Sequence, residues 1–284
     1  MGLSAADSGS PVFLLGVGRC GSTFWQTLLC RAEGLWIWGE HEGILRPILG
    51  TRQTIARSRS FPSSDISAIS PADVEHPLPQ HGYGLAWNNG FRAADLDEEL
   101  RGLIDGLMRR RLPPGKTRWG FKEIRYGHNS DGLPDETGSH LLALFPKSHL
   151  VLTLRHARPT IESSVRSFKP GEIANTAASP DRLRDEYSRL AHRWRRATEE
   201  LLDLADTYGE RVSRVMIEDV PAGRATLAAA LGIDLPEEHP VVNAHLCGED
   251  PSPMTKEIFA EMWDLWRPRV AATMARAGYD GDLC

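Results

Sequence analysis

The sequence predicts an α/β fold in which helices flank a central parallel sheet. Two observations carry this prediction: apolar segments of strand length alternate with segments of helical periodicity, and the first strand runs into a glycine-rich turn that opens a helix. The chain has 284 residues, of which 41% are hydrophobic and 25% charged, enough for one substantial core. We therefore expect residues 1–284 to form a single domain.

The first strand is expected at 11–16 and the first helix at about 21–32, joined by the turn Gly16-Val17-Gly18-Arg19-Cys20-Gly21-Ser22-Thr23. Glycines let the backbone bend tightly and point several N–H groups at one anion, and the helix adds its positive N-terminal end. The turn therefore predicts a phosphate site. Its spacing fits the phosphate-binding loop of nucleotide hydrolases and kinases, with Ser22 in place of lysine. It also fits the dinucleotide fingerprint, with Glu40 as the ribose-binding acid.

The elements that follow are expected in this order. A short strand at 35–38 delivers Gly39-Glu40-His41-Glu42 to the carboxyl edge of the sheet, where ligands bind in open parallel sheets. Residues 57–83 are rich in Ser and Pro and predict a long loop or a disordered surface insertion. Helices are expected near 95–111, 136–145, 221–231 and 254–277, and strands near 117–122, 150–155 and 211–217.

A long helix is predicted to begin at Ser179 and Pro180, because these residues suit a cap and a first helical turn. Its apolar residues recur at helical spacing. Three of its arginines favour a solvated face over a ligand site: Arg189, Arg193 and Arg196.

A second anion site is expected after the strand Leu150–Leu154, which ends in Arg155. Pro159 suits the first turn of a helix that would carry Ser163. A dianionic phosphate there would meet a guanidinium fork, a hydroxyl and unpaired backbone donors together.

The turn Gly-x-x-Arg-x-Gly-Ser-Thr between strand and helix resembles the 5′-phosphosulfate loop of sulfotransferases that use 3′-phosphoadenylyl sulfate (PAPS). Arg155 and Ser163, eight residues apart, resemble the pair that holds the 3′-phosphate of the cofactor in that family. The resemblance implies a three-layer P-loop-like fold, PAPS as co-substrate and 3′-phosphoadenosine 5′-phosphate (PAP) as product. It also implies that the 5′-phosphosulfate is held by Arg19, Cys20, Gly21, Ser22 and Thr23.

Sulfuryl transfer needs a group that activates an acceptor hydroxyl and a cation that stabilises the leaving phosphate. Glu40 stands where tyrosylprotein and several bacterial sulfotransferases have a catalytic glutamate, so the resemblance implies Glu40 as general base, with His41 as competitor. Lys122 resembles a lysine that some members place beside the bridging oxygen. Structural roles remain open: a ribose-binding or salt-bridged Glu40, an orienting His41, and an ion pair of Lys122 with Glu123 or another carboxylate.

Composition limits the partners. A formal charge of −5 gives no basic field for nucleic acid or a highly sulfated polysaccharide, so we expect a small-molecule or natural-product hydroxyl as acceptor. The loop at 57–83 is expected to cover its pocket, and Trp36, Trp38 and Trp87 either line that pocket or fill the core. Four scattered cysteines and ten histidines show no metal-ligand spacing, so no metal is expected.

No run of some 18 apolar residues and no leader pattern is present, which favours a cytoplasmic chain that does not contact a membrane. The sequence carries no signal for an oligomeric state. Three rival classes stay open: a nicotinamide or flavin oxidoreductase of Rossmann type, a small-molecule P-loop kinase, and a non-catalytic nucleotide-binding module. The oxidoreductase leaves Arg155 and Ser163 without a role, and the kinase lacks its loop lysine. The sulfotransferase prediction fails if Arg155 lies far from the Arg19 turn.

Overall fold

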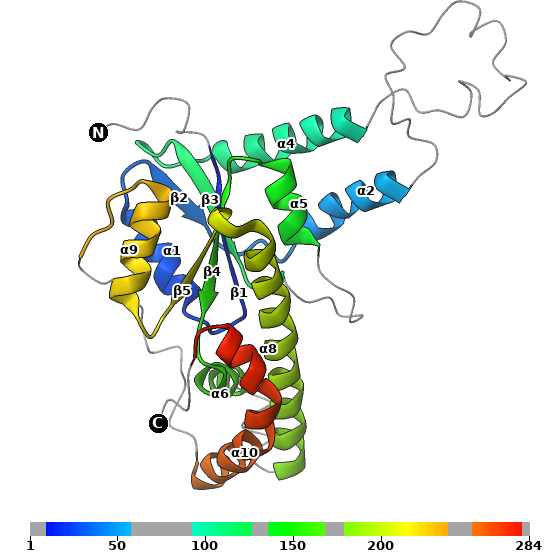
Figure 1. The fold of residues 1–284 in the computed structure, drawn as a ribbon, viewed down its shortest axis with the longest axis vertical. Coiled ribbons are helices and arrows are strands. Elements are labelled where there is room, and N and C mark those ends of the chain that lie inside the picture. Colours follow the sequence, from blue (N-terminus) through cyan, green and yellow to red (C-terminus); the bar gives the residue numbers. More distant parts are fainter. Residues whose placement is uncertain (1–9, 58–92, 127–135, 168–178, 238–251, 280–284) are drawn as a thin grey trace, which may run out of the picture.

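The computed structural model describes residues 10–57, 93–126, 136–167, 179–237 and 252–279. Five parallel strands form one sheet in the order β2-β3-β1-β4-β5 (Figure 1). The strands are β1 (Val12–Gly16), β2 (Leu35–Trp38), β3 (Arg118–Glu123), β4 (His149–Leu154) and β5 (Val212–Met216). The predicted α/β fold with a central parallel sheet flanked by helices is confirmed.

One face of the sheet is covered by α1 (Ser22–Arg31) and α9 (Val220–Leu231). Side chains alternate along a strand, so Val12 and Leu14 of β1 point to this face. The two helices pack closely, since a Cβ atom on Gly223 would lie 2.5 Å from the indole of Trp25. Asp219 caps α9 by accepting a hydrogen bond from the N–H of Ala222.

The opposite face is covered by four helices, and Phe13 and Leu15 of β1 point toward them. These helices are α2 (Leu45–Arg57), α4 (Ala93–Arg109), α5 (Thr137–Leu144) and the C-terminal half of α8 (Pro180–Tyr208). Sequence analysis did not predict α2. Pro47 and Gly50 interrupt its pattern, and it is stabilised by packing on α4 and α5. Arg52 of α2 also pairs with Asp97 of α4 at 2.5 Å.

The N-terminal half of α8 extends beyond the sheet, where α6 (Ala157–Ser167) and α10 (Pro253–Arg276) pack against it (Figure 1). Ser179 precedes this 29-residue helix and Pro180 stands in its first turn, as predicted. Buried Tyr187 and Trp194 belong to the apolar cluster that joins the three helices. This arrangement places α6, the helix after Arg155, between the sheet edge and α8.

Two predictions lie largely outside the described residues: the loop at 57–83, beyond Arg57, and the position of Trp87. Trp38 packs with the core, and its indole N–H donates to the carbonyl of Met108 in α4 at 2.9 Å. Across the described ranges, no helix combines the length and apolarity needed to span a bilayer. The single domain stays a prediction.

Candidate active site

The glycine-rich turn begins where β1 ends, at the carboxyl edge of the sheet. A Cβ atom on Gly16 would lie 2.1 Å from Thr153 Oγ1 in β4, so no side chain fits there. The turn then takes left-handed backbone angles, with φ of 69° at Arg19 and 85° at Gly21. Gly21 precedes α1 and no side chain caps the helix, so no capping side chain competes with an anion at this helix start.

The two predicted anion sites are in direct contact. Because β1 and β4 are neighbours, Arg155 emerges beside the turn, and its Nη1 donates to the backbone carbonyl of Arg19 at 3.1 Å. Arg19 Nε in turn donates to Ser163 Oγ of α6 at 3.0 Å. Arg155 therefore lies beside the Arg19 turn. The sulfotransferase prediction required this proximity, because one nucleotide must reach both sites.

Cys20 lies in the turn with its side chain directed into the protein. Its Sγ lies 2.8 Å from Thr153 Oγ1, and the residue is fully buried. Burial raises the pKa of the thiol, and the hydrogen bond with Thr153 offsets only part of that effect. The geometry therefore leaves the backbone of Cys20, rather than a thiolate, to face a ligand.

Glu40 and Lys122 meet at the same edge of the sheet. Glu40 follows β2, and Lys122 is buried in β3. Lys122 Nζ donates to Glu40 Oε1 at 2.6 Å, and Arg125 Nη1 donates to Glu40 Oε2 at 2.9 Å. The structure thus brings two candidate catalytic residues together, and the carboxylate that pairs with Lys122 is Glu40 rather than Glu123.

Glu123 was not predicted as a site residue, yet it holds this region together. It is fully buried and accepts hydrogen bonds from the N–H groups of His41, Gly43, Ile124 and Arg125 and from the Arg125 guanidinium. Burial by itself would raise its pKa, but these donors hold the pKa below its usual value. The ionised carboxylate therefore fixes the segment after β2 against the end of β3. An acidic residue at a strand's carboxyl end was the only sequence signal.

His41 follows Glu40 in the sequence, and the centroid of its ring lies 4.8 Å from that of Phe121. Both ring nitrogens are buried and make no hydrogen bond in the described part of the chain, although Nδ1 lies 3.4 Å from Glu123 Oε2. Burial lowers the pKa of His41 and outweighs the opposing effect of Glu123. At neutral pH the ring is therefore uncharged and covered, which suits an orienting residue better than a base in contact with an acceptor.

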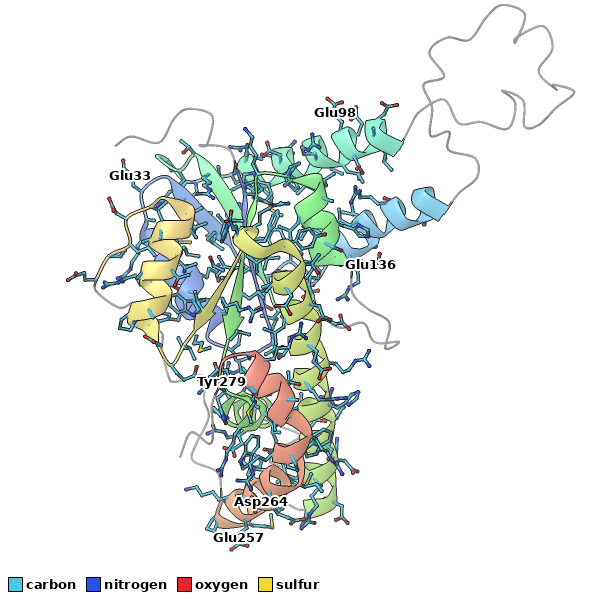
Figure 2. The ribbon with its side chains drawn as sticks, in the orientation of Figure 1. Glu33, Glu98, Glu136, Glu257, Asp264 and Tyr279 are labelled. Carbon is cyan, nitrogen blue, oxygen red and sulfur yellow. The ribbon has the colours of Figure 1, made fainter. Side chains whose placement is uncertain are left out.

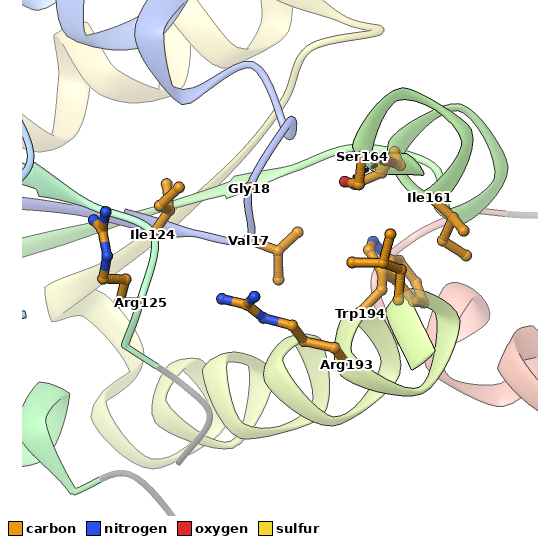
Figure 3. A pocket seen from close by; sticks show the side chains of 10 residues that line it. Val17, Gly18, Ile124, Arg125, Ile161, Ser164, Arg193 and Trp194 are labelled. Carbon is orange, nitrogen blue, oxygen red and sulfur yellow. Dashed lines mark hydrogen bonds between the residues drawn. The ribbon is translucent and has the colours of Figure 1, made fainter. Parts of the chain in front are cut away.

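A cavity of about 160 Å³ opens beside the turn (Figure 3). Val17 and Gly18 form one wall, Ile124 and Arg125 another, and α6 and α8 close it with residues that include Arg193 and Trp194. Arg193 is exposed, as a solvated face predicts, and it also lines this cavity because α6 and the turn lie opposite this part of α8. Arg193 stands next to buried Trp194 and one helical turn after buried Leu190, and this spacing could have placed it at the edge of the buried face of α8. Arg189, by contrast, pairs with Glu186 on the surface of α8.

No group of three His, Cys, Asp or Glu side chains among the described residues is arranged to hold a metal ion. The two predicted anion sites consist of arginines, a hydroxyl and the start of α1. A profile of the sulfotransferase family matches residues 11–225.

The chain belongs to the sulfotransferase family.

The matched region of this sulfotransferase includes both predicted anion sites, the Glu40–Lys122 pair and the cavity. The Rossmann oxidoreductase and the P-loop kinase are thereby set aside. No curated protein matches the sequence significantly.

Solved sulfotransferases resemble the chain over nearly its whole length at low identity. STF9 of Mycobacterium avium is 12% identical, with a TM-score of 0.47, and the alignment covers 97% of this chain and 78% of that one. Mouse SULT7A1, solved with PAP, is 9% identical with a TM-score of 0.42, over 95% of this chain and 88% of that one. STF1 of Mycobacterium tuberculosis is 13% identical with a TM-score of 0.39, over 95% and 76%. Because these TM-scores lie below 0.5, membership is assigned from the family profile.

Proposed function

We propose that this sulfotransferase transfers the sulfuryl group of PAPS to a hydroxyl of a small-molecule acceptor and releases PAP. The observation that carries the proposal is the chain of contacts from Arg155 through Arg19 to Ser163. PAPS has anionic groups at both its 5′ and 3′ positions, so it needs two anion sites within the reach of one nucleotide.

The residues present fit the donor. The uncapped start of α1, with the hydroxyls of Ser22 and Thr23, would hold the 5′-phosphosulfate, and the backbone of Cys20 and Gly21 completes that cradle. Arg155 and Ser163 would hold the 3′-phosphate. Arg19 lies between these sites, since its backbone belongs to the turn while its guanidinium contacts Ser163.

The chemistry is an in-line displacement at sulfur. The acceptor oxygen bonds to sulfur as the bond from sulfur to the bridging phosphate oxygen breaks. Glu40 takes the hydroxyl proton, and Lys122 turns from Glu40 to the bridging oxygen, where its charge stabilises departing PAP. Arg125 keeps the other oxygen of Glu40 in place during this exchange. His41 is the second candidate for the base.

We infer a small metabolite or natural-product intermediate as acceptor, because a formal charge of −5 offers no field for an anionic polymer. Four cysteines without a pairing pattern, with Cys20 and Cys30 present as free thiols, support a reducing compartment, the cytoplasm.

Ligand-induced thermal stabilisation tests the donor assignment. PAP at about 100 times its Kd stabilises the folded state by roughly 2.7 kcal/mol and raises Tm, whereas NAD and ATP with magnesium leave Tm unchanged. Arg155→Ala removes most of the PAP-induced shift, because the 3′-phosphate loses its guanidinium. Arg158→Ala is the matched control, since Arg158 pairs with Glu162 within the same helix. Equal shifts with all three nucleotides contradict the assignment.

A further inference from the structure

The cavity beside the turn is lined by direct neighbours of the proposed reacting groups on two sides. Gly18 lines it and precedes Arg19 directly, so one wall belongs to the proposed phosphosulfate loop. Ser164 of α6 lines it too, while the preceding Ser163 contacts Arg19. On the other side, Arg125 joins the cavity to Glu40 through a hydrogen bond. A hydroxyl group in this cavity would therefore lie near both the proposed phosphosulfate loop and the arginine that holds the proposed base.

Two arginines line this space, and their charges are balanced differently. Arg125 is neutralised by Glu40 and Glu123 at 2.9 and 2.8 Å. Arg193 has neither a carboxylate partner nor a hydrogen bond within the described ranges, although it reaches from α8 into the cavity below Val17 (Figure 3). The cavity thus holds one positive charge that no neighbouring side chain compensates.

The surroundings of Arg193 reinforce this imbalance. Arg193 is exposed on the solvent side, but partial desolvation and the nearby guanidinium groups of Arg189, Arg125 and Arg46 lower its pKa, and an arginine nevertheless stays protonated at neutral pH. A monoanion would balance the single uncompensated charge, and a planar carboxylate matches the guanidinium fork. The rest of the lining is largely apolar, with Val17, Ile161 and Trp194 able to pack against a carbon skeleton.

We propose that Arg193 binds the carboxylate of the acceptor, so that the preferred substrates are hydroxy acids with an apolar or aromatic skeleton. This inference rests on the proposed function, because it places the acceptor hydroxyl beside the sulfuryl donor. Arg193 is then a specificity-determining residue, and Arg125 a positioning residue for Glu40.

Matched acceptors test the inference. A panel of phenolic and aliphatic hydroxy acids is compared with the corresponding amides, using labelled PAPS and measuring kcat/KM. The acids are expected to exceed their amides at least tenfold. Arg193→Gln lowers kcat/KM for the acids about 10- to 100-fold, as loss of a charged hydrogen bond predicts, and brings the acid-to-amide ratio close to one. Arg193→Lys keeps an intermediate ratio, because charge remains without the fork.

Arg189→Gln is the control on the same helix, since Arg189 already pairs with Glu186, and it is expected to keep the wild-type ratio. PAP-induced stabilisation is measured for every variant. If PAP stabilises the protein but amides react as well as acids, or no acid reacts, the inference is wrong and the donor assignment stands. If Arg193→Gln loses the PAP response, Arg193 binds the donor and the inference is also wrong. If PAP does not stabilise the wild-type protein, the proposed function itself fails.

Discussion

Glu40 and Glu123 lie at the same edge of the sheet, yet their surroundings suit them to different tasks. Glu123 is fully buried and accepts five hydrogen bonds, so its oxygens are already engaged. The side chain of Glu40 is 28% exposed and held by two cations at the mouth of the site. Of these two carboxylates, only Glu40 is exposed enough to meet an acceptor hydroxyl. Glu123 is therefore assigned a structural role and Glu40 the role of proposed base.

Glu40→Gln is expected to lower kcat about 10²- to 10⁴-fold, because the amide cannot take the hydroxyl proton. PAP-induced stabilisation is retained, since Glu40 contacts neither proposed phosphate site. Steady-state sulfation with labelled PAPS measures the first effect and a thermal melt the second. Glu42→Gln, two residues along the same exposed segment, keeps its turnover. Full activity in Glu40→Gln would instead assign the base to His41.

The position of Arg155 depends on the contacts that fix the backbone at the end of β4. Glu218, after β5, accepts a hydrogen bond from the N–H of His156 at 3.0 Å and another from the hydroxyl of Tyr279 at 2.9 Å. Tyr279 follows α10 and lies where that helix returns to the sheet (Figure 2). One carboxylate thus joins the ends of two strands to the end of the last described helix.

Glu218→Ala is expected to lower the free energy of unfolding by about 1 kcal/mol and to weaken PAP binding, because the residue after Arg155 loses its anchor. Tyr279→Phe removes only the second hydrogen bond and is expected to leave the affinity for PAP unchanged. Urea unfolding and PAP titration separate the two effects. Wild-type affinity in Glu218→Ala would show that Arg155 is positioned without this link.

The stability of the whole molecule is expected to depend on the protonation of a histidine at the amino-terminal edge of the sheet, opposite the site. His149 begins β4, is buried, and its Nε2 lies 2.8 Å from Ser213 Oγ. Burial, together with the cations Arg118 and Arg211, lowers the pKa of His149 to about 4. Its ordinary pKa is near 6.5, so between these values the unfolded chain binds a proton that the folded chain excludes.

The free energy of unfolding is therefore expected to fall as pH drops from about 6.5 toward 4, by roughly 3 kcal/mol in total from this residue. Urea unfolding of the wild-type protein and of His149→Gln across this range measures the effect. The variant has no ring to protonate, so its deficit relative to wild type should shrink as pH falls. Parallel pH profiles for the two proteins would contradict the assignment.

Local sequence determined the parts of this protein that depend on backbone geometry over a few residues. The turn from Gly16 to Thr23 was predictable because left-handed angles and a close strand contact require glycine, and the start of α8 because Ser179 and Pro180 suit a helix beginning. The expectation that Arg155 and Ser163 serve one site came from a strand end, a helix start at Pro159 and the family resemblance, and in the structure both residues contact Arg19. Each of these signals lies in contiguous sequence.

Tertiary structure decided which distant side chains meet. Lys122 and Glu40 are 82 residues apart, and their contact requires β2 and β3 to be neighbours in the sheet. The segment that forms α2 is helical because α4 and α5 bury its apolar face. Arg193 is exposed, as periodicity predicted, and it lines a cavity only because α6 and the turn lie opposite α8. Periodicity describes a single element, whereas burial and charge pairing depend on what packs against that element.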